Sequence, residues 1–274
     1  MRVGLVQLCS SDRPDENLLQ ILDGLRQAAA AGADLVATPE VSNCVSNNRH
    51  HQTEVLRPES SDQTLAAVQD EAKILGVWVL VGSFALRSDD PDGRFVNRSF
   101  LITPQGEIYA RYDKIHMFDV ELSKTESYHE SKGYRPGTEA VVARTPFGTI
   151  GLTICYDLRF PSLYRTLAQN GAEILTIPSA FTRPTGEAHW DVLLRARAIE
   201  TGCFVVAPAQ TGEHKGSGRK TYGHSMVVAP WGEVLADAGT FPGVTLCDID
   251  LSAVAQARQR VPSLGHDRGF TLGQ

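Results

Sequence analysis

The sequence lacks a long hydrophobic run and any excess of basic residues. No apolar segment approaches the roughly 18 residues that a membrane-spanning helix needs. The formal net charge is −6, whereas nucleic-acid binders usually carry a basic footprint. We therefore expect neither a membrane nor a nucleic acid as a partner. The 42% of hydrophobic and 21% of charged residues are typical of a globular protein with a large core.

The sequence also lacks paired cysteines. Its five cysteines are an odd number, are widely spaced and form no CxxC motif, which argues against a disulfide framework and a zinc site. Histidines such as His116 and His129 show no HExxH spacing, so we expect no metal. Free thiols fit a reducing compartment, and we expect a cytoplasmic protein with one reactive cysteine and the others buried as small apolar groups.

Strand and helix patterns alternate along the chain, and no linker or repeat divides it. We therefore expect one α/β domain over residues 1–274, with buried sheets covered by helices. Hairpin patterns before residue 115 and after residue 220 indicate mixed sheets. Helices are expected at 17–31, 64–75, 161–170, 189–201 and 253–260, and strands at 3–8, 35–38, 77–81, 95–103, 107–111, 149–154, 174–177, 203–207, 225–229, 234–236 and 244–249.

Three reactive side chains directly follow predicted strands: Glu40, Lys114 and Cys155. Because ligands of α/β proteins bind beyond the carboxyl ends of strands, the three can converge on one pocket. A thiol with an ordinary pKa near 8.5 needs a base to become a nucleophile. Glu40 can serve as that base if burial raises its pKa. Lys114 and the backbone N–H of Tyr156 can stabilise the oxyanion that forms on an attacked carbonyl.

Each of these residues also has an ordinary structural interpretation. A cysteine at the end of an apolar strand is usually a packed core residue, Glu40 can be a loop carboxylate, and Lys114 can form a surface ion pair. Two further functions stay open: a papain-like Cys–His hydrolase with His116 or His189 as its base, and a non-catalytic scaffold that acts through its dimer surface.

The segments around these residues carry a resemblance. They read VATPE at 36–40, RYDKIH at 111–116, GLTICYDLRFP at 151–161, PSAFT at 178–182, AHW at 188–190, LRARAIE at 194–200 and YGHSMVV at 222–228. In this order the chain resembles the nitrilase, or carbon–nitrogen hydrolase, superfamily over nearly its whole length. The resemblance implies a four-layer αββα sandwich with two mixed β-sheets covered by helices, no metal or cofactor, and homodimers or higher oligomers.

The resemblance also assigns roles by position. Glu40 corresponds to the base, Lys114 to the oxyanion-stabilising cation and Cys155 to the nucleophile. A second glutamate that orients the lysine is common in the family, and Glu130 matches its place, although a solvated loop carboxylate is the alternative for this residue.

Nitrilases proper have Trp-Glu after the nucleophile, whereas this chain has Tyr156-Asp157 and so resembles the amidase branches. It is most similar to deaminated glutathione amidases, then to omega-amidases. The implied reaction is hydrolysis of a small amide through a thioester, giving 2-oxoglutarate and Cys-Gly from deaminated glutathione. The alternatives are 2-oxoglutaramate, another small amide or an N-carbamoyl amino acid.

Substrate specificity is the least readable part of the sequence. We expect loops 43–53 and 121–135 to form the pocket rim and 212–220 to be a mobile basic loop, but none of them can be matched to the family residue by residue. Tyr156, Phe181, Thr182 and Arg183 are candidates for substrate contact, because a guanidinium can pair with a substrate carboxylate through two hydrogen bonds. A surface loop position is the alternative for Thr182 and Arg183.

Overall fold

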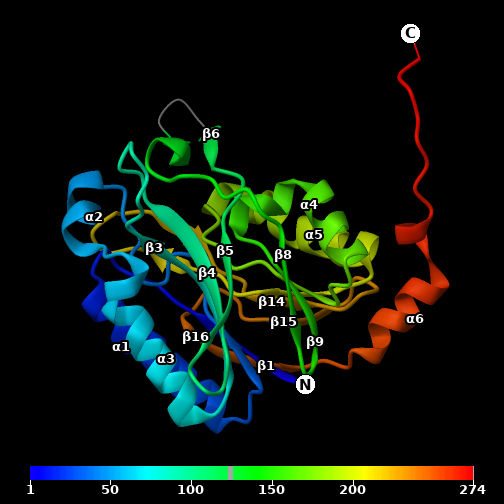
Figure 1. Cartoon of the computed structure of the whole chain (residues 1–274), viewed down its shortest axis with the longest axis horizontal. Helices are drawn as coiled ribbons and strands as arrows, with labels where there is room; N and C mark the ends of the chain where they lie inside the picture. Colours follow the sequence, from blue (N-terminus) through cyan, green and yellow to red (C-terminus); the bar gives the residue numbers. More distant parts are fainter. Residues whose placement is uncertain (123–125, 274) are drawn as a thin grey trace.

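The computed structural model describes residues 1–122 and 126–273 and arranges them in four layers (Figure 1). Two six-stranded sheets face each other. Helices α1 (Pro14–Ala30) and α3 (Gln63–Leu75) cover the outer face of the first sheet. Helices α4 (Pro161–Gln169) and α5 (Arg183–Thr201) cover the second. The αββα sandwich of mixed sheets that the sequence predicted is confirmed.

The first sheet is mixed. Strands β1, β2 and β3 are parallel neighbours, and β16, β4 and β5 extend the sheet through antiparallel pairs. The order is β16-β1-β2-β3-β4-β5, with bounds Gly243–Asp248, Arg2–Gln7, Leu35–Ala37, Trp78–Leu86, Val96–Ile102 and Ile108–Asp113.

The second sheet repeats this plan. Strands β9, β10 and β11 are parallel, and antiparallel strands flank them. The order is β15-β14-β11-β10-β9-β8, with bounds Val234–Asp237, Met226–Val228, Phe204–Ala207, Ile174–Thr176, Gly148–Leu152 and Val141–Thr145. Parallel strands are buried on both faces, which explains why these segments are uniformly apolar.

The core extends between the two sheets. Leu35 and Leu80 of the first sheet belong to the same buried cluster as Leu152 and Val205 of the second. A second cluster fills the space between the first sheet and helices α1 and α3. The strands are therefore held on both faces, so the residues that follow their carboxyl ends leave a rigid scaffold in fixed directions.

Helix α3 shows that local signals set element ends where the sequence predicted them. The Asp62 side chain accepts a hydrogen bond from the Leu65 N–H at 2.8 Å, which caps the first turn. Gly76 ends the helix at φ +67°, a left-handed conformation that glycine adopts without a steric penalty.

The predicted loops differ most from the structure. Loop 43–53 contains the start of helix α2 (Arg49–Val55), whose first turn is capped by the side chain of Asn48. The stretch 212–220 is not simply a mobile loop, because β12 (Thr211–Glu213) and β13 (Lys220–Tyr222) pair in an antiparallel hairpin. His214 fixes this hairpin through Ser10 and Thr221. Short polar segments of this kind carry little periodicity, so the sequence did not reveal them.

The predicted loop 121–135 lies partly outside the described residues, because it includes positions 123–125. Its flanks form strands β6 (Asp119–Glu121) and β7 (Ser127–His129), which pair with each other. Helix α5 begins at Arg183, six residues before the predicted start, because Pro184 suits the first turn of a helix.

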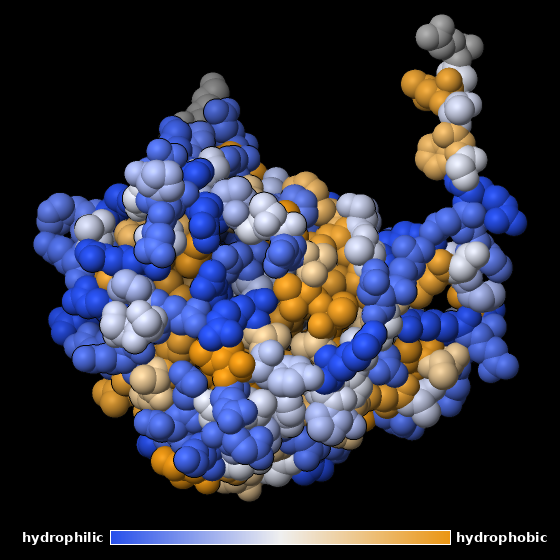
Figure 2. Space-filling model, viewed as in Figure 1, coloured by the Kyte–Doolittle hydropathy of each residue, from blue (hydrophilic) through white to orange (hydrophobic). Residues whose placement is uncertain are grey.

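The last helix, α6 (Ser252–Arg260), leads into a tail that stands away from the body (Figure 1). The tail carries apolar side chains into solvent (Figure 2), with Phe270 94% and Leu272 95% exposed. Across the described residues, no helix combines the length and apolar character needed to cross a bilayer.

Candidate active site

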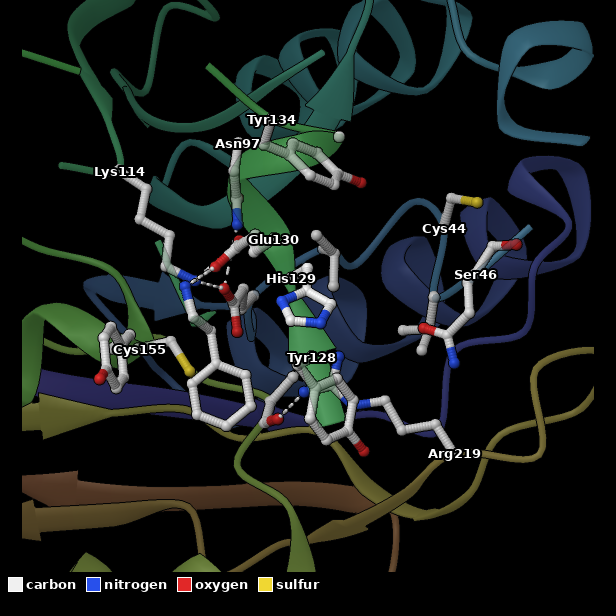
Figure 3. Close-up of a pocket in the computed structure, with 18 of the residues that line it drawn as sticks. Cys44, Ser46, Asn97, Lys114, Tyr128, His129, Glu130, Tyr134, Cys155 and Arg219 are labelled. Carbon is white, nitrogen blue, oxygen red and sulfur yellow. Dashed lines mark hydrogen bonds and ion pairs between the residues drawn. The ribbon is translucent and has the colours of Figure 1, made fainter. Parts of the chain in front are cut away.

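Three of the predicted site residues meet in one cavity. Glu40 follows β2, Lys114 follows β5 and Cys155 follows β9. All three line a cavity of about 480 Å³ between the strand ends and the loops (Figure 3). The proximity that the strand positions predicted is therefore present in the fold.

Lys114 lies at the centre of this group. Its Nζ donates to Glu40 Oε1 at 2.8 Å and to Glu130 Oε1 and Oε2 at 2.9 and 2.8 Å, and its side chain is 2% exposed. Burial lowers the pKa of Lys114, but the two carboxylates outweigh burial and raise it well above its usual range. The ammonium therefore stays charged at all relevant pH values.

Glu40 is held in one orientation by two donors on the same oxygen. Oε1 accepts from Lys114 and also from Asn97 Nδ2, at 3.0 Å. The Cys155 thiol is a further hydrogen-bond partner of the Glu40 carboxyl group. Burial raises the pKa of Glu40, as the sequence analysis expected, but Lys114 overrides this and the net pKa is lowered. The expectation of a raised pKa is thus wrong: Glu40 is an ionised carboxylate at neutral pH, ready to accept a proton.

Cys155 is a buried thiol on strained backbone. Its φ of +49° is unusual for a residue with a side chain, and Val41, next to Glu40, has φ +46°. Such strain concentrates at functional sites. Burial and the adjacent Glu40 charge raise the pKa of Cys155 more than Lys114 lowers it. The resting thiol is therefore protonated and needs the carboxylate beside it to become a nucleophile.

Glu130 lies against Lys114, where the resemblance placed a second glutamate. It stands on the single turn Glu130–Lys132 after β7, and its Oε2 also accepts from the Phe118 N–H at 2.6 Å. Its side chain is 14% exposed. The alternative of a solvated loop carboxylate does not describe this position.

The predicted substrate-contact residues divide into two pairs. Tyr156 and Phe181 line the cavity. Thr182 does not; its hydroxyl lies 2.9 Å from that of Thr185, at the start of helix α5. Arg183 is exposed in the first turn of the same helix. Neither Thr182 nor Arg183 is among the residues that line the cavity, so the structure does not bring these two predicted residues to the site.

Among the cavity residues that sequence reasoning did not single out are Asn97, Arg49 and Arg219. Arg49 donates to the carbonyls of Gly133 and Gly93, each at 2.5 Å. Arg219 Nη2 donates to the Ala180 carbonyl at 2.5 Å. Arg219 was visible as part of a basic loop, but its direction depends on the hairpin pairing. Asn97 lies within β4, and nothing in the sequence pattern of this strand marks it as a cavity residue.

The cavity is cationic although the protein is acidic. Lys114, Lys132, Arg49 and Arg219 line it, against Glu40 and Glu130, a formal excess of 4 − 2 = +2 in a chain of net charge −6. Because Glu40 and Glu130 neutralise Lys114, the excess positive charge of the cavity is carried by the loop residues Arg49, Lys132 and Arg219. This charge favours an anionic ligand.

The histidines proposed for a Cys–His hydrolase have other partners. His116 Nδ1 lies 2.7 Å from Asp157 Oδ1, and its ring stacks on Phe160. His189 Nδ1 lies 3.2 Å from Arg159. Neither lines the cavity, so the geometry does not support a Cys–His pair. Within residues 1–122 and 126–273, no cluster of His, Cys, Asp and Glu has the arrangement of a metal site.

Comparison with known proteins gives a consistent result. Residues 2–259 match the model of the carbon–nitrogen hydrolase family. The deaminated glutathione amidase of Yersinia enterocolitica is 41% identical over 97% of this chain and 92% of that protein. The C. elegans NitFhit crystal structure has TM-score 0.90 at 34% identity over 97% of this chain, which spans 65% of that longer protein.

A third comparison bears on the chemistry. A mutant amidase from Nesterenkonia sp. AN1 has TM-score 0.78 and 25% identity over 95% of this chain and 94% of that one. Its structure shows the acetamide moiety of fluoroacetamide added covalently at the active-site cysteine. The family match and the 41% identity over nearly the full length confirm the resemblance read from the motifs. The chain therefore belongs to the carbon–nitrogen hydrolase family of the nitrilase superfamily and is an amidase.

Proposed function

We propose that Glu40, Lys114 and Cys155 hydrolyse a small amide through a thioester, with Glu130 orienting Lys114. The observation that carries this proposal is the buried Lys114 ammonium, which bridges Glu40 and Glu130 beside a protonated thiol. An ionised base, a fixed cation and a nucleophile in one cavity are the parts that acyl transfer needs.

The reaction starts with a proton transfer. Glu40 takes the Cys155 proton as the sulfur attacks the amide carbonyl carbon. The carbonyl oxygen becomes an oxyanion, which Lys114 Nζ and the Tyr156 N–H stabilise. The intermediate collapses to a thioester, and Glu40 returns the proton to the departing amine.

Hydrolysis of the thioester reverses these roles. Glu40 takes a proton from water, and the resulting hydroxide attacks the thioester carbonyl carbon. The carbon–sulfur bond breaks, the acid is released, and Glu40 returns its proton to the sulfur. The enzyme is regenerated, and one water has been consumed for each amide.

We infer that the substrate is deaminated glutathione, cleaved to 2-oxoglutarate and Cys-Gly. Support comes from the relative of that name at 41% identity and from the cationic excess of the cavity, since this amide carries carboxylates on both sides of the scissile bond. 2-Oxoglutaramate, another small amide and N-carbamoyl amino acids are the competing substrates.

The test compares deaminated glutathione, 2-oxoglutaramate, an N-carbamoyl amino acid and a simple nitrile side by side. We expect the highest kcat/KM on deaminated glutathione, and a loss of at least about 10⁴-fold in Cys155→Ala. Cys203→Ala is the matched control, because Cys203 is also buried but lies away from the cavity. Full activity in a folded Cys155→Ala protein would eliminate this mechanism. Absence of turnover on every amide would favour a non-catalytic scaffold.

We also propose that residues 1–274 act as one domain in a cytoplasmic homodimer or higher homo-oligomer. Val192 and Ile199 of α5 are 65% and 56% exposed, and apolar surface of this kind favours contact with a second copy. The five cysteines are free, which suits a reducing compartment. Light scattering that reports a monomer at micromolar concentration would contradict the oligomer, and cell fractionation would test the location.

A further inference from the structure

The two unpaired guanidinium groups of the cavity occupy different environments. Arg49 is half-buried at the rim, where it donates to the carbonyls of Gly133 and Gly93 and lies over the Phe95 ring. Arg219 Nε, in contrast, is buried and has no hydrogen-bond partner among the described residues. Neither arginine has an acidic partner in residues 1–122 and 126–273, whereas Arg98, for comparison, pairs with both Asp113 and Glu59. Arg219 is half-buried and forms no salt bridge among the described residues, so a ligand carboxylate would give its guanidinium a directly bonded counter-charge.

Arg219 is fixed in place close to the nucleophile. Its Nη2 holds the Ala180 carbonyl, and Ala180 lies at the Cys155 thiol and lines the cavity beside it. The guanidinium carbon lies 5.4 Å from the centre of the Tyr128 ring, a cation–π distance. Figure 3 shows Arg219 and Tyr128 on the side of the cavity opposite Lys114. The guanidinium is therefore preorganised, and its remaining N–H groups are available to a ligand.

The inner position of Arg219 indicates which part of the substrate it meets. During the reaction the amine must leave while the acyl group remains on Cys155, so the acyl group occupies the inner end. Lys132 is exposed and Arg49 is half-buried at the rim, so we assign the departing amine to that end of the cavity.

We propose that Arg219 binds a carboxylate at the far end of the acyl group and so makes the enzyme selective for amides of dicarboxylic acids. The proposal rests on the proposed function and adds to it the residue that selects the acyl group. A guanidinium can form two parallel hydrogen bonds with a carboxylate, which fixes both the charge and the direction of the ligand.

The hairpin explains how this contact is maintained. Arg219 directly precedes β13, and His214 at the other end of the loop accepts from Thr221 and donates to the Ser10 carbonyl. Burial lowers the pKa of His214 to about 4, so His214 stays neutral and keeps both bonds at physiological pH. The hairpin thus presents Arg219 from a rigid element rather than from a free loop.

The experiment uses two amides that differ in one carboxylate: glutaramate, the monoamide of a five-carbon dicarboxylic acid, and valeramide, which has the same chain length and no charge. Arg219→Gln is expected to lower kcat/KM for glutaramate by roughly 10- to 100-fold, the cost of losing a hydrogen bond to a charged group. For valeramide the expected change is less than about 3-fold, because no charged contact is lost.

Two further variants separate charge from structure. Arg219→Lys keeps the charge but not the planar fork, and should recover part of the glutaramate activity. Lys220→Gln removes the neighbouring charge, which pairs with Glu213 outside the cavity, and should leave both substrates unaffected.

Three results would overturn the proposal. An equal loss on both amides would make Arg219 a structural support of Ala180, and no loss on either would remove it from the site. A third substrate, N-valeryl-Cys-Gly, carries its carboxylate on the amine side, and a loss confined to this substrate would mean that Arg219 binds the carboxylate of the amine.

A second experiment needs no turnover: the binding of glutarate to Cys155→Ala, with and without Arg219→Gln, is measured by calorimetry. We expect Arg219→Gln to weaken glutarate binding roughly 10- to 100-fold. If the proposed function fails, no amide is hydrolysed but this difference in glutarate affinity remains.

Discussion

The two sides of the cavity differ in how their charges are satisfied. On the side formed by the strand ends, Lys114 is enclosed by Glu40 and Glu130 at 2.8–2.9 Å. On the side formed by the loops, Arg49 and Arg219 contact backbone carbonyls and no acid among the described residues. The charge of Lys114 is neutralised without substrate, whereas Arg49 and Arg219 keep charge that favours an anionic ligand. The first arrangement suits bond cleavage, and the second suits recognition.

The largest effect is expected when the Lys114 cation is removed from between Glu40 and Glu130. Lys114→Met leaves Glu40 and Glu130 buried without their cation, so we expect a loss of stability of about 3–5 kcal/mol. kcat/KM should fall at least about 10³-fold, because the oxyanion also loses its charged donor. Urea unfolding and amide hydrolysis measure the two losses. Lys73→Met, on the exposed face of α3, is the control; a Lys114 variant as stable and active as this control would refute the assignment.

A smaller effect is expected at Glu130. Glu130→Gln keeps the shape of the side chain but removes one of the two charges on Lys114, so the ammonium is less firmly oriented. We expect kcat to fall about 10²-fold with KM little changed, as for a loss of positioning in the transition state. Steady-state kinetics separate the two parameters. A change in KM alone would mean that Glu130 contacts substrate rather than Lys114.

Asn97 gives a test through pH. Its Nδ2 donates to ionised Glu40, so Asn97→Leu should raise the pKa of Glu40 and move the acidic limb of kcat/KM to higher pH. Because the folded pKa of Glu40 is lowered, the stability that this carboxylate contributes is present above its unfolded pKa and is lost as pH falls through the folded one.

The matched control for this shift is Asn17→Leu, which removes another buried amide with no contact to the cavity. Both variants should unfold at lower temperature, but the acidic limb should move in Asn97→Leu alone. An unmoved limb would make Asn97 a structural residue.

The smallest effect belongs to the rim. Arg49→Gln should raise KM for deaminated glutathione about 3- to 10-fold and leave kcat unchanged, since a partly solvated charge at the rim contributes little and binds ground and transition states alike. The effect should shrink as salt is added. A large fall in kcat would place Arg49 on the catalytic side of the cavity and contradict the division of roles between the two sides.

The same contrast explains what the sequence could predict. Glu40, Lys114 and Cys155 follow strands whose apolar patterns are plain, and the carboxyl ends of such strands define a common edge. The direction of Arg219 depends instead on a short hairpin held by His214, and Arg183 lies outside the cavity lining as the first residue of α5. The pKa of Glu40 was misjudged for a related reason: burial is readable from sequence, but the 2.8 Å contact with Lys114 is not.

The most direct test of the account is the mass of the enzyme during turnover. Protein mixed with deaminated glutathione and quenched in acid within milliseconds should carry the 2-oxoglutaryl group, attached to the peptide that contains Cys155. Glu40→Gln, which lacks the base, should show no such adduct. Rapid hydrolysis without an acyl adduct, or an adduct on a different residue, would contradict the claim that this thiol, activated by an ionised carboxylate, carries the reaction.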